Sequence, residues 1–195
     1  MITIRPYSKS DFRFVQDICM QTSALADEDN ATNRAMLCSM YCDYYLDNEP
    51  QFCFVATDDE IPVGYILCSA DVEKYEEAMT ENYLPLVRKI NGSEYYRFAA
   101  ELKLNERYVS QGYTAHMHID ILPEYQHKGI GTQLVQTLVK QLSETPVNDI
   151  YAGGLFLLVA KKNEQARAFY EKCGFEDIDY ITGAVVYGKR LDAEE

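Results

Sequence analysis

The order of hydrophobic and polar residues along the chain alternates between helical spacing and short apolar runs. Ser8 and Asp11 have the spacing of a capping box, which predicts a helix start. Apolar residues then recur at intervals of three and four, the spacing of one helix face, at Val15, Ile18 and Cys19. A second stripe of this kind ends near Pro50 and predicts a second helix; its members are Leu37, Met40, Tyr41 and Tyr44.

Short apolar runs separated by polar turns predict the strands. Residues 52–56 and 63–70 lie on either side of a polar turn at 57–60, which is typical of a β-hairpin. Gly174 lies in the place of a glycine that ends a helix. The remaining predicted elements are strands at 1–6, 115–122, 155–160, 177–182 and 184–190, and helices at 131–142 and 164–173.

This order of elements predicts the α/β (α+β) class, with a mixed sheet and helices on both of its faces. The 195 residues fit a single domain, which we expect to span 1–195. With 47% hydrophobic residues, the chain has enough apolar side chains to bury a sizeable core.

One long stretch, residues 71–112, breaks this regular order of elements. It contains eight acidic residues, six basic residues and five tyrosines. Helical spacing is clearest around 72–90 and 95–104, so we expect a helical insert. Insertions of this length in a compact domain are typically lids or binding elements. An acceptor lid, a homodimer contact and an extra packed pair of helices are all open alternatives.

The chain is strongly acidic, with 31 Asp and Glu against 18 Lys and Arg and a formal net charge of −13. A negative field repels phosphate backbones and anionic lipid headgroups, so we expect neither nucleic acid nor a membrane surface as the main partner. An anionic ligand therefore needs a local binding device, such as the start of a helix. The same field mildly favours the approach of a cationic amine.

Six cysteines are spread along the chain without a C-x-x-C pair. Most lie in apolar runs, and Cys38 and Cys42, one helical turn apart, have no histidine close to them in the sequence. We therefore expect no metal site, and we interpret the cysteines as buried, reduced thiols of a cytoplasmic protein.

The stretch 119–132 carries the clearest chemical signal in the sequence. A buried strand leads through a short turn into a helix whose start includes Gly129 and Gly131. Glycine lets the backbone come close to a ligand, and the first N–H groups of a helix have no partners within it. Together with the helix dipole, this predicts binding of a pyrophosphate. The Gln-x-x-Gly-x-Gly spacing at 126–131 differs from the Walker and dinucleotide-binding patterns, which argues against nucleotide-binding proteins of those kinds.

Two motifs in this order resemble the GNAT family of N-acetyltransferases. Residues 126–131 resemble its acetyl-CoA signature, Q/R-x-x-G-x-G/A, and residues 163–175 resemble its downstream pattern, N-x-x-A-x-x-F-Y-x-x-x-G-F. The resemblance covers the chain apart from 71–112, and it implies a mostly antiparallel central sheet in an acyl-CoA N-acyltransferase fold. The second predicted helix, the insert and the strand residues 116–120 are also similar to the acetyltransferase-like domain of some O-GlcNAcases.

The resemblance implies acetyl-CoA as cosubstrate and gives roles to particular residues. Ile121 would offer backbone groups to the pantetheine arm and an N–H to the thioester carbonyl. Asn163 would contact the cofactor, although capping of its own helix alone would also explain it. The pyrophosphate would be held by the loop and helix start, namely Gln126, His127, Lys128, Gly129, Ile130, Gly131 and Thr132. Of these, His127 stands at a variable position and is expected to face solvent.

Tyr170 stands where the family often has a tyrosine that protonates the departing thiolate. As a member of the inward stripe of the helix at 164–173, it would also serve as a core aromatic residue. The two roles are compatible, because the ring of a tyrosine can pack while its hydroxyl reaches a partner.

Three ionisable residues alternate along the predicted strand at 115–122. His116, His118 and Asp120 are two residues apart and therefore share one face of the strand. Ionisable groups in an apolar strand need partners, so this row is either a proton relay toward the acceptor amine or a structural hydrogen-bond cluster. Asp120, next to Ile121, is our first choice for the base or amine anchor, and His118 would support it.

These observations predict an acetyl-CoA-dependent N-acetyltransferase that moves an acetyl group to a primary amine by direct attack on the thioester. Tyr170, Asp120 and His118 are the predicted catalytic residues, and a small-molecule or peptide amine is the expected acceptor. The alternative is a binding module that keeps the fold but has lost the chemistry. The intact loop at 126–131 and Tyr170 favour the enzyme.

Overall fold

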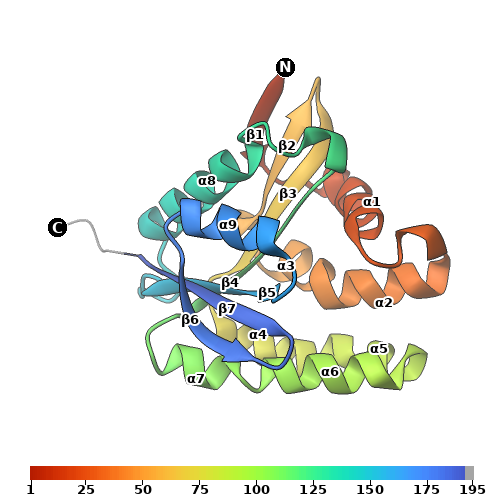
Figure 1. Ribbon diagram of the computed structural model, residues 1–195, viewed down its shortest axis with the longest axis vertical. Coiled ribbons are helices and arrows are strands. Elements are labelled where there is room, and N and C mark those ends of the chain that lie inside the picture. Colours follow the sequence, from red (N-terminus) through yellow and green to blue (C-terminus); the bar gives the residue numbers. More distant parts are fainter. Residues whose placement is uncertain (192–195) are drawn as a thin grey trace.

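Seven strands form one sheet within residues 1–191, the part of the chain that this computed structural model describes. Their order across the sheet is β1-β2-β3-β4-β5-β7-β6, and every neighbouring pair is antiparallel except β4 and β5. The strands are β1 (Ile2–Pro6), β2 (Phe54–Asp58), β3 (Ile61–Ser69), β4 (Ala115–Ile121), β5 (Gly154–Ala160), β6 (Glu176–Ile181) and β7 (Ala184–Arg190). This mixed, mostly antiparallel sheet confirms the predicted fold class (Figure 1).

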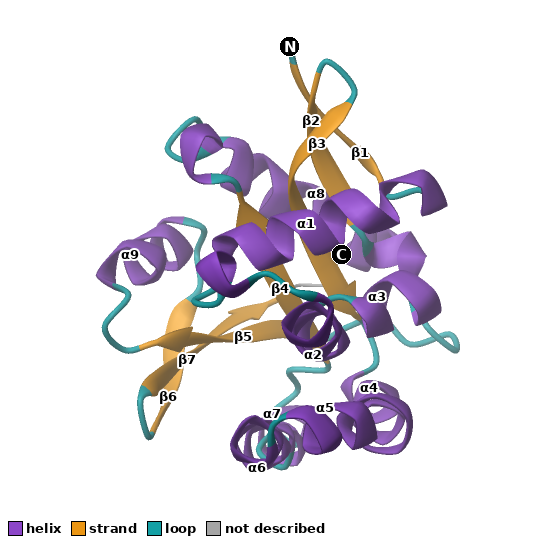
Figure 2. Ribbon diagram, turned by 90° about the vertical axis from the view of Figure 1, so that its right-hand side faces the viewer, coloured by secondary structure: helices purple, strands orange, loops and turns teal. Residues whose placement is uncertain are grey.

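Helices cover both faces of the sheet, as the alternation of its side chains requires (Figure 1, Figure 2). In β3, Ile66 enters the core under one layer of helices, whereas its neighbours Tyr65 and Leu67 enter the core on the opposite face. One face carries α8 (Ile130–Glu144) and α9 (Glu164–Lys172), and the other carries α1 (Phe12–Thr22), α2 (Ala31–Tyr41) and α3 (Asp43–Asn48).

The predicted insert is helical over most of its length. Its helices are α4 (Val72–Ala78), α5 (Leu84–Ile90), α6 (Gly92–Leu102) and α7 (Asn105–Val109), with a π-helical turn at Met79–Tyr83. They lie along the lower side of the molecule in Figure 1, where α5 contacts α2 and α6. The insert therefore extends the helical layer on the α1–α2 side.

Short 3-10 turns join several of these elements, at Lys9–Asp11, Ala26–Glu28, Pro50–Phe52 and Pro123–Tyr125. At the first of them the predicted capping box is present, because the Ser8 N–H donates to the Asp11 carboxylate at 2.9 Å. None of the helices within residues 1–191 is both long and apolar enough to span a membrane.

Most boundaries lie within one or two residues of the predicted ones, and two differences change the local structure. β2 continues through Thr57 and Asp58 of the predicted turn and β3 begins at Ile61, which leaves a two-residue connection, Asp59 and Glu60, with positive φ angles of 45° and 73°. Turns of this hand match the twist of a hairpin, so the polar residues beside the turn still pair. The second predicted helix breaks at Cys42, whose φ of −128° separates α2 from α3.

β4 and β5 pair over only two positions, Ala115 with Leu155 and His116 with Phe156. Beyond them the two strands diverge, while β4 stays paired with β3 and β5 stays paired with β7. Figure 2 shows β4 and β5 running in clearly different directions. The hydrogen-bonded sheet is therefore interrupted along residues 117–121 of β4.

Candidate functional site

The interruption leaves backbone groups of β4 without a strand partner. The Leu122 N–H donates to the Val63 carbonyl at 3.0 Å. This bond shows which residues of β4 direct their backbone groups toward β3. In an antiparallel ladder, alternate residues direct both backbone groups to the same neighbour. Ile119 and Ile121 therefore direct their N–H and C=O groups away from β3, toward the side where β5 has diverged. This edge can pair with an extended ligand.

The turn after β4 and the start of α8 form the predicted anion site. Gly129 has a φ of +79°, in the left-handed region that favours glycine, and a Cβ built on it would meet no atom within 4 Å. The Gln133 N–H donates to the Gly129 carbonyl at 3.2 Å, so the N–H groups of Ile130–Thr132 belong to the first turn of α8. Such N–H groups have no acceptor within their own helix. Open space beside donors of this kind fits a phosphate group.

Gly131 has a packing role that the sequence analysis missed. A Cβ on Gly131 would stand 2.9 Å from the Phe169 ring and 3.4 Å from the Ile121 side chain. Glycine at this position lets α8 pack directly against α9 and the end of β4. Close approach of a ligand, which the sequence suggested for both glycines, therefore fits Gly129 better.

The side chains of the loop make local contacts. The Gln126 amide donates to the Ile121 carbonyl at 2.9 Å, which ties the loop to the last residue of β4. His127 is exposed, as expected, and its Nε2 lies 3.1 Å from the Gln165 amide nitrogen on α9. The Lys128 ammonium lies 5.0 Å from the centre of the Tyr125 ring. The loop therefore connects β4 with α9, the two elements that flank the interruption.

Asn163 caps α9. Its side-chain oxygen accepts the Ala166 N–H at 3.1 Å, and the residue itself is exposed. The capping alternative is thus present in the structure. The exposed position leaves the amide nitrogen available for a ligand at the start of the helix.

Tyr170 combines a packed ring with a hydroxyl that makes no hydrogen bond within residues 1–191. The residue is 8% exposed, and its ring packs against Phe169, Phe175 and Tyr187 at centroid distances of 5.0, 5.7 and 6.0 Å. Burial, followed by the negative charge of Asp120, raises the pKa of the Tyr170 hydroxyl well above its usual range. The phenol therefore keeps its proton at neutral pH and can donate it.

The row of ionisable residues on β4, namely His116, His118 and Asp120, divides into two parts. His116 is half-buried where β4 and β5 still pair, and its Nδ1 lies 2.9 Å from the Tyr45 hydroxyl. Burial, followed by the charge of His118, lowers the pKa of His116 to about 3, so its ring is neutral at physiological pH. His118 and Asp120 lie in the interrupted part, with side chains that are 25% and 28% exposed. Only these two residues fit the predicted relay.

Tyr65 connects the two remaining residues of the row. Its hydroxyl donates to the Asp120 carboxylate at 2.8 Å and lies 3.3 Å from His118 Nδ1. His118 Nε2 lies 3.8 Å from the same carboxylate, and the Tyr41 ring stacks on His118 at 5.2 Å. Burial is the largest influence on Asp120 and raises its pKa, whereas the nearby His118 lowers it. The row is thus both hydrogen-bonded and partly open.

Tyr65 and Tyr41 were missed as members of this site. Both lie in apolar stretches, where a tyrosine resembles an ordinary core residue. The signal available in the sequence was the ionisable row itself, because buried ionisable groups require polar partners from the elements beside them.

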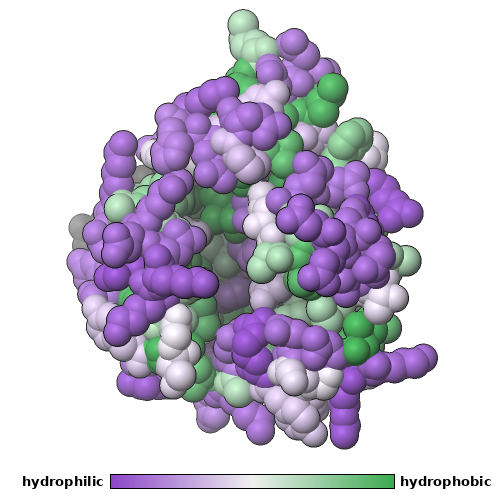
Figure 3. All heavy atoms as spheres, turned by 45° about the vertical axis from the view of Figure 1, so that its right-hand side comes forward, coloured by the Kyte–Doolittle hydropathy of each residue, from purple (hydrophilic) through white to green (hydrophobic). Residues whose placement is uncertain are grey.

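The face that carries the row is hollowed. Figure 3 shows a depression rimmed by hydrophilic side chains, with paler and more hydrophobic atoms deeper inside. In Figures 1 and 2, α9 lies on one side of the diverging strands β4 and β5, and α1 and α2 lie on the other. A pocket of about 90 Å³ lies between β4 and the insert and is bordered by His116 and His118.

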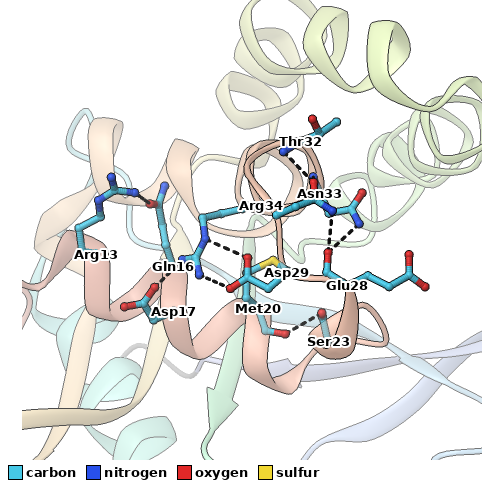
Figure 4. Close-up of polar contacts among 11 residues, drawn as sticks. Arg13, Gln16, Asp17, Met20, Ser23, Glu28, Asp29, Thr32, Asn33 and Arg34 are labelled. Carbon is cyan, nitrogen blue, oxygen red and sulfur yellow. Dashed lines mark hydrogen bonds and ion pairs between the residues drawn. The ribbon is translucent and has the colours of Figure 1, made fainter.

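Ion pairs hold the elements beside the depression. Arg34 on α2 lies between Asp17 on α1 and Asp29 in the connection and pairs with both carboxylates (Figure 4). Asn30 caps the start of α2 through its side-chain oxygen. These contacts fix α2, which carries Tyr41, against α1.

A larger groove of about 960 Å³ lies away from the row. Its border runs along α8 from Thr132 to Glu144 and includes Cys173 and Lys189. It contains neither Asp120 nor Tyr170. Pocket size alone therefore does not point to the predicted catalytic residues, whereas the divergence of β4 and β5 lies beside them.

Comparison with known protein sequences agrees with this geometry. The sequence profile of the Acetyltransferase (GNAT) family matches residues 19–175. N-alpha-acetyltransferase 30 of Schizosaccharomyces pombe is 25% identical over 175 residues, which cover 90% of this chain and 84% of that protein.

Solved structures share the fold. The crystal structure of SsHAT has a TM-score of 0.79 at 27% identity, with 98% of each chain covered. Arabidopsis thaliana Naa50, in complex with the bisubstrate analogue CoA-Ac-MVNAL, has a TM-score of 0.55 at 17% identity, with 96% of this chain and 97% of that chain covered. The family profile spans most of the chain, and its range includes the interrupted strand, the loop and α9. The chain therefore belongs to the Acetyltransferase (GNAT) family of enzymes.

Proposed function

We propose that this chain transfers the acetyl group of acetyl-CoA to a primary amine by direct attack of the amine on the thioester. The interrupted pairing of β4 and β5 carries the proposal, because a backbone edge, a helix start and a carboxylate come together there. Acetyl-CoA supplies an activated acyl group. The protein then has to position the amine, accept its proton and stabilise the negative charge on the thioester oxygen.

Ile121 is the proposed donor to the thioester oxygen. Its N–H is directed into the interruption, and its carbonyl is held by Gln126 at 2.9 Å. A backbone N–H fixed in this way can stabilise negative charge without reorganisation. The N–H groups of Gly129–Thr132 are proposed to hold the pyrophosphate, and Asn163 the neighbouring part of the cofactor.

Asp120 is the proposed base. An amine arrives protonated at neutral pH and must lose a proton before it can attack. Burial raises the pKa of Asp120, which makes its carboxylate a stronger base, while the Tyr65 hydroxyl keeps that carboxylate oriented. His118 is proposed to support Asp120 through the shared Tyr65 contact.

Tyr170 is the proposed acid for the departing thiolate. Its phenol is protonated at neutral pH, and its hydroxyl makes no hydrogen bond to another residue within 1–191. Its ring packing holds the hydroxyl in one orientation, which suits a proton transfer of fixed geometry.

A peptide α-amine is the acceptor that we favour. The S. pombe relative is named an N-alpha-acetyltransferase, and the bisubstrate analogue in the Naa50 structure joins CoA to a peptide. The net charge of −13 also favours a cationic amine over an acidic acceptor. The six free cysteines support the cytoplasm as its location.

Titration calorimetry with acetyl-CoA, followed by a thiol-release assay over amines, amino acids, aminosugars and peptides, tests this function. Binding together with amine-dependent release of CoA is the expected result. Binding without release for any amine would favour the alternative, a catalytically silent module of the same fold. Absence of binding would contradict both the cofactor and the reaction.

A further inference from the structure

The pocket between β4 and the insert, which we call the insert pocket, is bordered by His116 and His118 of β4 and by Phe98, Leu102 and Asn105 of the insert. Its volume of about 90 Å³ accommodates a group of a few heavy atoms. His118 belongs to this border and is also the neighbour of Asp120. The insert pocket therefore adjoins the proposed reaction centre at His118.

Asn105 is the unusual member of this border. It is only 4% exposed, and its side-chain amide nitrogen is sealed from solvent without a hydrogen-bond partner. Over residues 1–191, this nitrogen is the one sealed side-chain polar atom in that state. Buried amide groups in proteins are nearly always hydrogen-bonded, so a partner from outside the described residues is expected.

The rest of the insert pocket is mostly aromatic and apolar. Tyr45 and Tyr75 stack at 5.4 Å, and Tyr75 stacks on His116 at 5.5 Å. Glu101 is the one carboxylate on the border, and its charge is balanced by Arg97 at 2.7 Å. Walls of this kind favour an uncharged group over a cation or an anion.

We propose that the insert pocket binds a neutral amide group of the acceptor, paired with the side chain of Asn105, while the acceptor amine lies at Asp120. An amide offers one donor and one acceptor at the same spacing as the asparagine side chain, so both of its polar ends are satisfied by one partner. The acceptor part of this proposal rests on the acetyltransferase function proposed above.

Strand geometry sets the distance between the proposed base and the edge of the insert pocket. His118, which borders the pocket, and Asp120 are two residues apart on β4, which corresponds to about 7 Å. A glutamine side chain of the first residue and the second backbone amide of a peptide both lie at roughly that distance from the α-amine. The side chain and the backbone are therefore two sources of the same amide chemistry.

Asn105→Leu tests the proposal, because leucine has a similar size and removes both polar ends. Asn82→Leu is the matched control, since Asn82 is an exposed residue of the insert outside the pocket. The three acceptors are a glutamine-led tripeptide, a methionine-led tripeptide and butylamine. We measure kcat/KM for each acceptor, and the melting temperature of each protein.

Asn105→Leu is expected to lower kcat/KM for the amide-bearing acceptor about tenfold to a hundredfold and to leave butylamine within about twofold. If the side chain is recognised, only the glutamine-led peptide is affected; if the backbone is recognised, both peptides are affected. The melting temperature should hold or rise, because an unpaired buried amide is removed. Equal losses for all three acceptors, or a fall in melting temperature with unchanged acceptor preference, would overturn the proposal.

Calorimetry separates this proposal from the proposed function. If the wild-type protein acetylates none of the three acceptors, the reaction fails but the insert pocket can still be tested by titrating both peptides into the acetyl-CoA-loaded protein. Binding of a peptide that Asn105→Leu weakens and Asn82→Leu does not would support amide recognition. Equal binding to all three proteins, or no binding at all, would reject it.

Discussion

The Tyr65 hydroxyl on β3 donates a hydrogen bond of 2.8 Å to the Asp120 carboxylate, directly opposite it on β4. The same hydroxyl lies 3.3 Å from His118 Nδ1. This donation favours the charged form of Asp120 and opposes the burial that raises its pKa. Tyr65 therefore contributes, together with the larger influences of burial and His118, to whether the Asp120 carboxylate is charged when the amine arrives.

Asp120→Asn should remove the proposed base and lower kcat/KM by about 10² to 10⁴. The acidic limb of the pH profile, where the wild-type carboxylate becomes protonated, should disappear with it. A raised pKa in the folded state means that stability falls as pH rises through the unfolded and then the folded value. At neutral pH the neutral asparagine should therefore keep or raise the melting temperature.

Asp43→Asn is the matched control for this variant. Asp43 is another carboxylate whose pKa is raised by burial, and it accepts a hydrogen bond from Gln16 at 2.9 Å. Its replacement should leave the activity and the acidic limb unchanged. A large fall in the melting temperature of Asp120→Asn with near-normal activity of the folded fraction would give Asp120 a structural role instead.

Tyr65→Phe should move the acidic limb of the kcat/KM profile to higher pH. Loss of the hydroxyl removes a contact that lowers the pKa of Asp120, so the carboxylate becomes protonated at a higher pH. A pH series from about 5 to 9 measures the midpoint. Tyr44→Phe, which removes a buried hydroxyl bound to Glu49, is the control and should leave the midpoint in place. An unshifted midpoint in Tyr65→Phe would disconnect Tyr65 from the base.

The sequence predicted the strands, most helices and the loop because those features depend on local periodicity. Alternation placed His116, His118 and Asp120 on one face of β4, and glycine spacing located the start of α8. These features depend only on residues that are close to one another in the sequence.

Long-range register was beyond the sequence. The Tyr65–Asp120 contact joins residues 55 positions apart and depends on how β3 pairs with β4. The close approach of Gly131 to Phe169 likewise depends on how α8 meets α9. The division of the row at His116 follows from where β4 and β5 part, because His116 still lies in the paired stretch, whereas His118 and Asp120 lie beyond it.

Tyr170→Phe should lower kcat by about 10² while the affinity for acetyl-CoA is retained. The substitution removes the hydroxyl and keeps the ring that packs against Phe169 and Phe175. Tyr187→Phe is the control, because Tyr187 packs against the same ring but its hydroxyl donates to Glu171 at 2.8 Å. Equal kcat values for the wild type and Tyr170→Phe would leave Tyr170 with packing alone.

Gly129→Asp and Gly129→Asn should separate charge from shape at the start of α8. Both side chains meet open space, and both have the same backbone cost of about 1–2 kcal/mol at a positive φ. Aspartate at a helix start stabilises the helix, so its melting temperature should equal or exceed that of the asparagine variant. Its affinity for acetyl-CoA should nevertheless be at least about tenfold lower, because the carboxylate repels the pyrophosphate.

Titration calorimetry and thermal unfolding of both variants measure these opposite trends. Gly131→Ala provides the contrast, because the Cβ of alanine would lie 2.9 Å from the Phe169 ring. This variant should therefore have a lower melting temperature and a smaller loss of acetyl-CoA affinity than Gly129→Asp. Equal affinities of the aspartate and asparagine variants at Gly129 would mean that the phosphates bind elsewhere. If the aspartate variant is the more stable of the two and still binds acetyl-CoA more weakly, a folding defect cannot explain the loss of affinity. The negatively charged part of the ligand would then lie at this helix start.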